Sequence, residues 1–268
     1  MELRYTILDP TKNITILVTT PVPRDMQPRV AAELLQRERD VEQVGFAEGL
    51  AAGTPRLQMM GGEFCGNATM SMAAWLPRDM PVGESRTLTL PVSGAPGPVS
   101  CQVTRIDGCF IGTVSMPLPE RIDTLSLPVC GVTQSLPVVF LPGICHVIVP
   151  VEMVSRARAE ETLRSWGDLL PGEAMGLLLL EEDQMAFTPL VYVKPTDSCV
   201  WEHGCGSGSV SIGAWLTAVR GTNQCVSLRQ PGGVIQVVTQ TEASGRLSAL
   251  TITGTVLIGK TKTANILL

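Results

Sequence analysis

The chain has 268 residues, of which 44% are hydrophobic, 17% charged and 4% aromatic, and its formal net charge is −5. This balance is typical of a globular protein with a sizeable core and excludes a disordered segment. The acidic charge, the scarcity of aromatic residues and the lack of Lys or Arg runs exclude a nucleic-acid-binding surface.

The first half of the chain alternates patterns of strands and helices. Runs rich in Thr, Ile and Val predict strands, and apolar residues at helical spacing predict helices. The expected strands cover 3–9, 14–20, 42–46, 56–60, 86–92, 98–105 and 109–116, and the expected helices cover 26–39 and the residues after Cys65. Pro117-Leu118-Pro119 then breaks the pattern, which predicts a domain crossing at that point.

The second half repeats this order of elements. The expected strands cover 144–149, 174–180, 186–193, 225–230, 234–239 and 252–256, and the expected helices cover 155–166 and the residues after Cys205. A last strand at about 263–268 lies beyond the repeat, and we expect it to return to the first domain. The predicted domains are therefore 1–117 plus about 263–268, and 118–262.

One twelve-residue stretch occurs twice, at 65–76 and at 205–216. The first copy begins Cys-Gly-Asn-Ala and the second Cys-Gly-Ser-Gly, and six of the twelve positions are identical. The copies lie 140 residues apart, which indicates an internal duplication and predicts an α+β fold of two pseudo-symmetric domains. Trp75 and Trp215 occupy the same place in the two copies, and we expect both to anchor their helices in the core.

Each copy places a cysteine immediately before a helix. The unpaired N–H groups and the positive dipole end of the helix stabilise an anion there, so we expect a lowered thiol pKa. A matched pair of thiols across one cleft can remove a proton from one face of a carbon and supply one to the other face. The two helix N-termini can also hold a carboxylate. This pattern predicts racemisation or epimerisation of a small-molecule amino acid.

Other readings of the cysteines stay open or are disfavoured. Two structural cysteines, or a non-catalytic amino-acid-binding protein, would also fit a duplicated helix start. A disulfide oxidoreductase is disfavoured because the chain has no Cys-x-x-Cys, and with two histidines a metal site is also poorly supported. Pyridoxal phosphate is disfavoured because none of the four lysines is placed as a Schiff-base residue. The other six cysteines are interpreted as small buried hydrophobes.

The N-terminus carries no basic segment followed by an apolar run, so no signal peptide is predicted. The most apolar long window, 136–154, is broken by Pro137, Pro142 and Pro150, and we expect strands and turns there instead of a membrane span. These patterns predict a cytoplasmic protein with no membrane partner.

The motifs Glu63-Phe64-Cys65-Gly66-Asn67-Ala68 and Cys205-Gly206-Ser207-Gly208 resemble the paired cysteine motifs of the diaminopimelate epimerase superfamily. These enzymes are cofactor-independent racemases and epimerases, and the resemblance covers nearly the whole chain. It implies two domains, each a barrel-like sheet around a central helix. It also implies that Cys65 and Cys205 are the acid/base pair, with no cofactor and no metal. A dimer is common in this superfamily, although no interface can be read from the chain.

The resemblance also implies the residues that bind the substrate. These are Gly66, Asn67, Gly206 and Ser207 at the carboxylate, Asn13 and His146 at matching cleft positions, and Glu202 just before the second cysteine. From the residues alone, His146 on an apolar strand could equally be a satisfied core residue.

One segment departs from true diaminopimelate epimerases. Those enzymes carry an arginine and several more residues before the second cysteine, which hold the distal end of the substrate. Here Trp201-Glu202-His203-Gly204 runs directly into Cys205. Diaminopimelate is therefore a disfavoured substrate. A diaminopimelate epimerase, or a racemase of another amino acid, stays as an alternative hypothesis.

The chain is more similar to the histidine racemases that supply D-histidine for opine-type metallophores of the staphylopine kind. The shared motifs are Glu42 to Phe46, Glu63 to Met70, Trp201 to Gly208, and Gln230 to Gly233. By this resemblance Glu42 would help to read the substrate side chain, because a carboxylate accepts a hydrogen bond from an imidazole N–H. Without it, Glu42 could be a solvated residue at the start of a strand. The sequence therefore predicts conversion of L-histidine to D-histidine.

Overall fold

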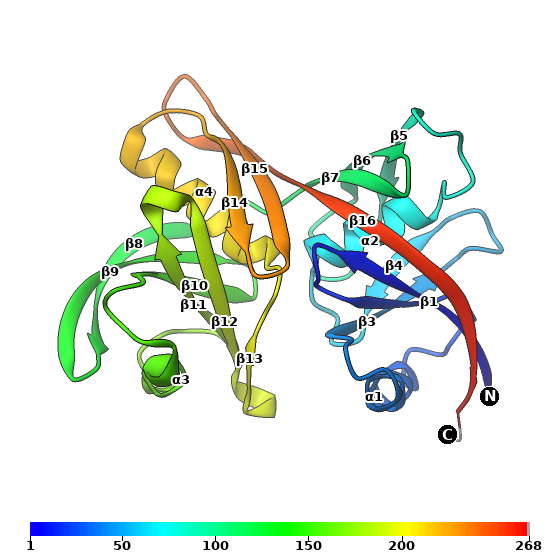
Figure 1. The fold of residues 1–268 in the computed structure, drawn as a ribbon, viewed down its shortest axis with the longest axis horizontal. Helices are drawn as coiled ribbons and strands as arrows, with labels where there is room; N and C mark the ends of the chain where they lie inside the picture. The colour runs from blue at the N-terminus through cyan, green and yellow to red at the C-terminus, as the bar shows by residue number, and fades with distance from the viewer. Residues whose placement is uncertain (267–268) are drawn as a thin grey trace. The chain divides into compact units, whose positions relative to one another are not determined.

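The computed structural model describes residues 1–266, which form two compact units. Unit 1 consists of Met1–Ser115 together with the chain from Thr253 onward, and unit 2 consists of Met116–Ile252 (Figure 1). The crossing at Ser115 lies next to the expected break. The return occurs earlier than the expected position near 263, because β16 is one continuous strand, Leu247–Asn265, that contributes to both units. Residues 267 and 268 of the expected last strand lie outside the described part.

Unit 1 contains the elements expected for the first half. They are β1 (Glu2–Pro10), β2 (Thr15–Val18), α1 (Gln27–Arg37), β3 (Gln43–Glu48), β4 (Arg56–Met59), α2 (Gly66–Trp75), β5 (Ser85–Leu90), β6 (Val99–Ile106) and β7 (Cys109–Ser115). Their strands pair in the order β4-β3-β2-β1-β16, and β5-β6-β7 joins the other side of β16. A parallel bridge between Leu57 of β4 and Val92, just after β5, connects the two ends of this order. The strands of unit 1 therefore curve into a barrel-like sheet.

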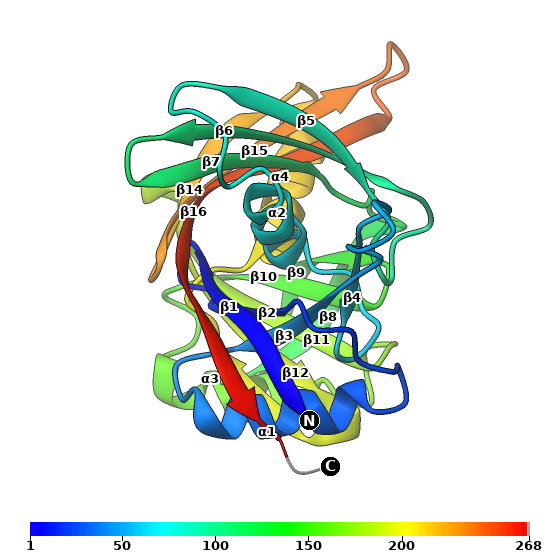
Figure 2. The ribbon, with the colours of Figure 1, turned by 90° about the vertical axis from the view of Figure 1, so that its right-hand side faces the viewer.

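Helix α2 fills the centre of this sheet. It packs against β1, β2, β5, β6 and β7, and Figure 2 shows it ringed by the strands of unit 1. All of its residues from Gly66 to Ala74 are buried. A helix that is apolar or small on every side is suited to a fully enclosed position, because it has no polar face to leave in water. The small residues also let the strands approach: a Cβ on Gly112 of β7 would lie 2.3 Å from Met70 Cγ.

Unit 2 repeats this arrangement with additional strands. Its elements are β8 (Arg121–Val129), β9 (Val132–Leu141), β10 (Ile144–Pro150), α3 (Arg156–Ser165), β11 (Ala174–Glu181), β12 (Ala186–Val193), β13 (Ser198–Trp201), α4 (Gly206–Arg220), β14 (Cys225–Gln230) and β15 (Gly233–Thr241). Their strands pair in the order β8-β9-β10-β11-β12-β14-β15-β16, with β13 on β12. Helix α4 packs against β9, β10, β14 and β15. It is the central helix of unit 2, as α2 is of unit 1.

Both units place an amphipathic helix between two parallel strands. Helix α1 joins β2 to β3 and buries Val30, Ala31 and Leu34, while α3 joins β10 to β11 and buries Ala159 and Leu163. Parallel strands need such a crossover, and its apolar face covers the sheet. Among the helices in residues 1–266, none combines the length and the apolar character that a membrane crossing requires.

Candidate functional site

Cys65 and Cys205 are the N-cap residues of α2 and α4. Both have extended backbone, with φ/ψ of −130°/114° and −113°/109°. The sulfur of Cys65 accepts a hydrogen bond from the Ala68 N–H at 3.4 Å, and that of Cys205 accepts one from the Gly208 N–H at 3.3 Å. These bonds are the ones that a Ser or Asp side chain makes at an N-cap, so each thiol replaces the usual capping oxygen. The prediction of a thiol at each helix N-terminus is therefore confirmed.

Around Cys65, several predicted site residues form one hydrogen-bonded cluster. The Asn13 side-chain oxygen accepts bonds from Asn67 Nδ2 at 3.0 Å and from Gln43 Nε2 at 2.7 Å. The Asn13 amide nitrogen in turn donates to the Glu42 carboxylate. Gln43 also donates to Thr15 Oγ1 at 2.8 Å. Asn13, Glu42 and Asn67, which are far apart in the sequence, are thus connected, and Gln43 is the residue that sequence analysis missed.

The topology of unit 1 explains this cluster. Asn13 lies two residues before β2 and Glu42 immediately precedes β3, and these strands are parallel with Thr15 beside Gln43. The starts of neighbouring parallel strands meet at one edge of a sheet, so the two side chains meet there. The Glu42 N–H donates to the Ile14 carbonyl at 3.0 Å, which fixes this edge. Gln43 belongs to the motif Glu42 to Phe46 that the sequence singled out, but its contacts are visible only in the structure.

Around Cys205, an amide side chain holds the first turn of α4. Gln230, at the end of β14, accepts from the Cys205 backbone N–H at 2.6 Å and donates to Ser209 Oγ at 3.0 Å. The Ser209 hydroxyl donates to the Cys205 carbonyl at 2.7 Å. Gln230 is 8% exposed, so these bonds are shielded from water. Gln230 belongs to a motif that the sequence singled out, but its role is visible only in the structure.

A second chain of contacts leads from Cys205 into the sheet. Ser207 Oγ lies 3.4 Å from Cys205 Sγ and 2.9 Å from Nε2 of His146 on β10. The His146 side chain is fully buried, and burial lowers its pKa to about 3. The imidazole is therefore neutral at neutral pH. The structure thus places His146 in contact with Ser207, another predicted site residue.

The Cys205 thiol has a pKa well above its ordinary value. Burial is the main cause, since Cys205 is 4% exposed and its charged form loses hydration. The Glu202 carboxylate raises the pKa further through its charge and by accepting a hydrogen bond from the thiol. Ser207 and the Gly208 N–H act in the opposite direction. The expectation of a lowered pKa is therefore wrong for Cys205, because burial outweighs the effect of the helix N-terminus.

The remaining predicted residues occupy the first helical turns. Gly66 and Gly206 are the residues that follow the two cysteines, and both are buried. Glu202 follows the last residue of β13, and its N–H donates to the Pro189 carbonyl at 3.0 Å. Each unit thus brings its own predicted residues together at its cysteine: Asn13, Glu42, Gly66 and Asn67 in unit 1, and His146, Glu202, Gly206 and Ser207 in unit 2.

The other cysteines do not all fit the interpretation as buried hydrophobes. Cys101 and Cys145 are buried, and burial raises their pKa values to about 12 and about 11. Cys225 is exposed, and Cys109, Cys130 and Cys199 are half-buried, which corrects the expectation for them. Residues 1–266 contain no disulfide bond and no cluster of three or more His, Cys, Asp or Glu suited to a metal ion.

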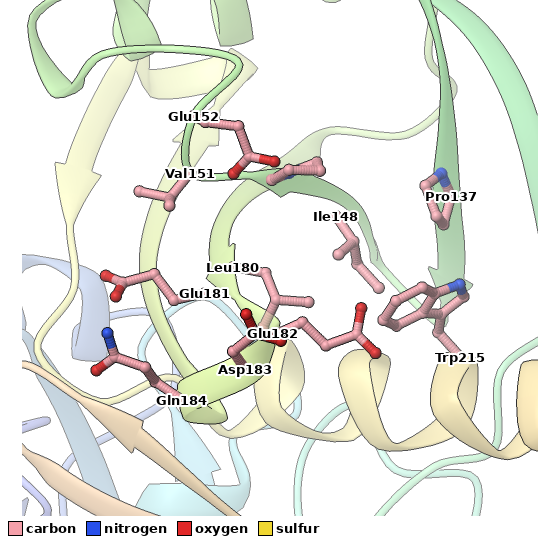
Figure 3. Close-up of a pocket in the computed structure, with 11 residues that line it drawn as sticks. Pro137, Ile148, Val151, Glu152, Leu180, Glu181, Glu182, Asp183, Gln184 and Trp215 are labelled. Carbon is pink, nitrogen blue, oxygen red and sulfur yellow. The ribbon is translucent and has the colours of Figure 1, made fainter.

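Unit 2 also contains a pocket of about 410 Å³ near the C-terminal half of α4 (Figure 3). Its lining is Pro137, Ile148, Pro150, Val151, Glu152, Leu180, Glu181, Glu182, Asp183, Gln184 and Trp215. None of the predicted site residues lines it. Trp215 is half-buried there, as Trp75 is in α2, so the expectation that both are core residues is wrong. The fully buried tryptophan is Trp166, whose indole donates to the Pro128 carbonyl at 2.8 Å.

Some known proteins are similar to this chain in sequence, and others have a similar fold. The family model described as the histidine racemase CntK N-terminal domain matches residues 2–264. A histidine racemase of Fusobacterium nucleatum is 28% identical over 249 residues, covering 90% of each chain. A histidine racemase of Staphylococcus aureus is 28% identical over 247 residues, covering 89% of each. A hydroxyproline epimerase of Agrobacterium vitis, with bound trans-4-hydroxy-L-proline, has a TM-score of 0.66 at 14% identity, covering 98% of this chain and 92% of that one.

Proposed function

The chain belongs to the histidine racemase CntK N-terminal domain family and is an isomerase of the racemase class, and on that premise we propose that it interconverts L-histidine and D-histidine without a cofactor. In this proposal Cys65 and Cys205 are the two acid/base groups. A thiolate on one cysteine removes the α-proton and becomes a thiol. The thiol on the other cysteine gives its proton to the opposite face of the carbanion and becomes a thiolate. Each inversion therefore exchanges the protonation states of the two cysteines.

The observation that carries this proposal is the matched N-cap geometry of the two cysteines. A base that must remove a proton from carbon needs a sulfur whose charged form is stabilised, and an N-cap position provides backbone N–H donors for it. The first N–H groups of the same helices are suited to bind the substrate carboxylate and the charge that develops on the carbanion. Gly66, Asn67, Gly206 and Ser207 are the residues of those first turns.

The raised pKa of Cys205 supports its role as the first proton donor in this proposal. A buried thiol beside the Glu202 carboxylate is protonated at neutral pH, so Cys205 begins as the proton donor. Cys65 is half-buried and is then the base that removes the first proton. Because both thiols must stay reduced for this cycle, we also place the enzyme in the reducing cytoplasm.

The Glu42 carboxylate supports histidine as the substrate. Glu42 is held by the Asn13 amide, and Asn13 is held by Asn67 in the first turn of α2. A fixed carboxylate beside the carboxylate-binding helix end can accept a hydrogen bond from an imidazole N–H of the substrate. Residues 201–204 carry no arginine that could hold a second amino-acid group, which disfavours diaminopimelate.

The test is chiral analysis of products from the reduced protein with no added cofactor. L-histidine should give D-histidine, and D-histidine should give L-histidine, until both are equal. Diaminopimelate, proline and other amino acids form the comparison panel. Inversion of another amino acid but not of histidine would overturn the substrate and keep the chemistry. Binding of histidine without inversion of any amino acid would overturn the racemase mechanism in favour of a binding protein.

A further inference from the structure

The contact between His146, Ser207 and Cys205 has a direction that follows from the histidine tautomer. The imidazole is neutral, so only one of its two nitrogens carries a proton. Nε2 lies 2.9 Å from Ser207 Oγ. Nδ1 is buried and has no hydrogen-bond partner among the described residues. The two tautomers therefore differ in what is left unpaired at Nδ1: a proton in one and a lone pair in the other.

The surroundings of Nδ1 favour the tautomer with the lone pair there. His146 lies beside Gly176 in the parallel pairing of β10 with β11. A Cβ on Gly176 would lie 2.2 Å from Nδ1, so the ring packs directly on the glycine Cα. An N–H pointing at carbon would be a buried orphan donor, and such donors are rarer in proteins than orphan acceptors. The proton therefore sits on Nε2.

This tautomer decides the orientation of the Ser207 hydroxyl. When Nε2–H donates to Ser207 Oγ, the serine oxygen is the acceptor, and the hydroxyl proton can be donated to another neighbour. The other neighbour of the hydroxyl is Cys205 Sγ at 3.4 Å, within hydrogen-bond range of sulfur. We propose that His146 is a positioning residue that directs the Ser207 hydroxyl to donate to the Cys205 thiolate. Its role in racemisation rests on the proposed function of Cys205. The chain of contacts from His146 through Ser207 to Cys205, called the relay below, is itself a property of unit 2.

The relay opposes the effect of Glu202 on the same sulfur. Glu202 favours the thiol, because it accepts a hydrogen bond from it and repels the thiolate. The Gly208 N–H donates to sulfur, and in the proposed orientation the Ser207 hydroxyl does too, so both favour the thiolate. An acid/base group that alternates between donor and acceptor benefits from such balanced partners, since neither protonation state is trapped. His146 supplies this balance without changing its own charge.

The test is the rate at which iodoacetamide alkylates Cys205, measured against pH by peptide mass analysis. Only the thiolate reacts, so the rate at a pH below the pKa reports the thiolate fraction. Ser207→Ala should slow alkylation by about tenfold, the effect of losing one hydrogen bond to a charged group. His146→Leu should slow it by a similar factor. His146→Gln, whose amide N–H can replace Nε2–H, should keep a rate near that of the parent protein.

Two further variants make the result specific to the relay. Adding His146→Leu to Ser207→Ala should not slow the alkylation of Cys205 further, because the histidine acts through the serine. Glu202→Gln should speed alkylation, which shows that the measurement detects shifts in both directions. If His146→Leu does not fold, His146→Asn removes the same donor, since its amide is too short to reach Ser207. An unchanged alkylation rate in both His146→Leu and His146→Asn, or additive losses in the double variant, would overturn the proposal.

This measurement is separate from the proposed function because it needs no substrate. Loss of the relay with intact racemisation would leave the two-thiol mechanism standing and remove His146 from it. An intact relay in a protein that inverts no amino acid would leave the role of His146 at Cys205 standing and remove the proposed function.

Discussion

The cysteines that begin α2 and α4 share one backbone geometry and lie in different surroundings. Each sulfur caps its helix through the N–H three residues later, and each carbonyl accepts a hydroxyl bond at 2.7 Å, from Thr69 in unit 1 and from Ser209 in unit 2. The second residue after each cysteine differs. Asn67 connects Cys65 to an amide and carboxylate cluster, whereas Ser207 connects Cys205 to a buried histidine.

This difference indicates a division of roles between two copies of one motif. The duplicated backbone supplies what both cysteines share, which is a sulfur capped by a backbone N–H at the start of a helix. The side chains around it differ: Glu42 joins the amide cluster of unit 1, whereas Glu202 and Ser207 in unit 2 shift the pKa of a buried thiol in opposite directions.

The largest effect is expected where the copies are equivalent. Cys65→Ser and Cys205→Ser should each reduce histidine racemisation by about 10³-fold or more, because a hydroxyl is too weak an acid to replace either thiol. Serine is a good N-cap residue, so the helices should remain folded. Cys225→Ser, at an exposed position, is the matched control and should keep full activity. A large loss in only one of the two variants would show that the copies are not equivalent.

The next effect concerns His146, the buried neutral histidine that Ser207 contacts in unit 2. Its pKa is about 3 in the folded protein and about 6.5 when unfolded, so the unfolded state binds more protons between these values. The stabilisation is complete above pH 6.5 and is lost as the pH falls toward 3. Between pH 7 and 4.5 the free energy of unfolding should fall by about 2–3 kcal/mol more in the parent protein than in His146→Gln. Urea unfolding at both pH values measures the free energy of unfolding. An equal fall with pH in the parent protein and in His146→Gln would contradict a neutral buried His146.

A smaller effect is expected from changing the residue whose N–H caps each cysteine sulfur, which is Ala68 in unit 1 and Gly208 in unit 2. A Cβ on Gly208 would lie 2.9 Å from Leu178 Cδ2 and 3.2 Å from Cys205 Sγ. Gly208→Ala should therefore destabilise the protein by about 1–3 kcal/mol through overpacking and slow racemisation by displacing the thiol. The matched change in unit 1 is Ala68→Gly, which should cost only about 0.5–1 kcal/mol of helix stability. Thermal unfolding of both variants tests this order, and equal destabilisation would show that Cys205 is no more tightly enclosed than Cys65.

The smallest effect is expected at Glu42, the side chain that we propose contacts the substrate. Glu42→Gln keeps an acceptor for Asn13 but removes the charge that would favour the histidine ring. We expect KM for histidine to rise about tenfold with little change in kcat, because Glu42 is remote from the proton transfer. Glu2→Gln, exposed in the same unit, is the control. A fall in kcat with unchanged KM would instead place Glu42 in the chemistry.

Much of the fold follows from local patterns, because the helices and most strands carry clear periodicity. The strands that the sequence does not show are β8, β9 and β13. Pro137 sits inside β9, and proline normally argues against a strand. The hairpin between β8 and β9 turns at Cys130 and Gly131, both with positive φ, and Cys-Gly is not among the common turn pairs. Tertiary pairing overrides these local signals.

The candidate site shows the same limit. A cysteine before a run of small residues predicts a helix cap, so the positions of Cys65 and Cys205 can be read from the chain. The contacts of Gln43, Gln230 and Gly176 depend on which strands are neighbours, and no local pattern records that. The raised pKa of Cys205 also depends on burial by the whole of unit 2, which a motif cannot show.

The measurement that tests the two-thiol account most directly is the isotope content of both enantiomers early in the conversion of L-histidine in D₂O. A thiol carries a single proton, so the proton taken from L-histidine by one cysteine cannot be the one that the other cysteine delivers. The account predicts that the first D-histidine formed carries deuterium at the α-carbon while the remaining L-histidine keeps its proton. D-histidine that retains the original proton would show that one base serves both faces, and the paired cysteines would lose their proposed role.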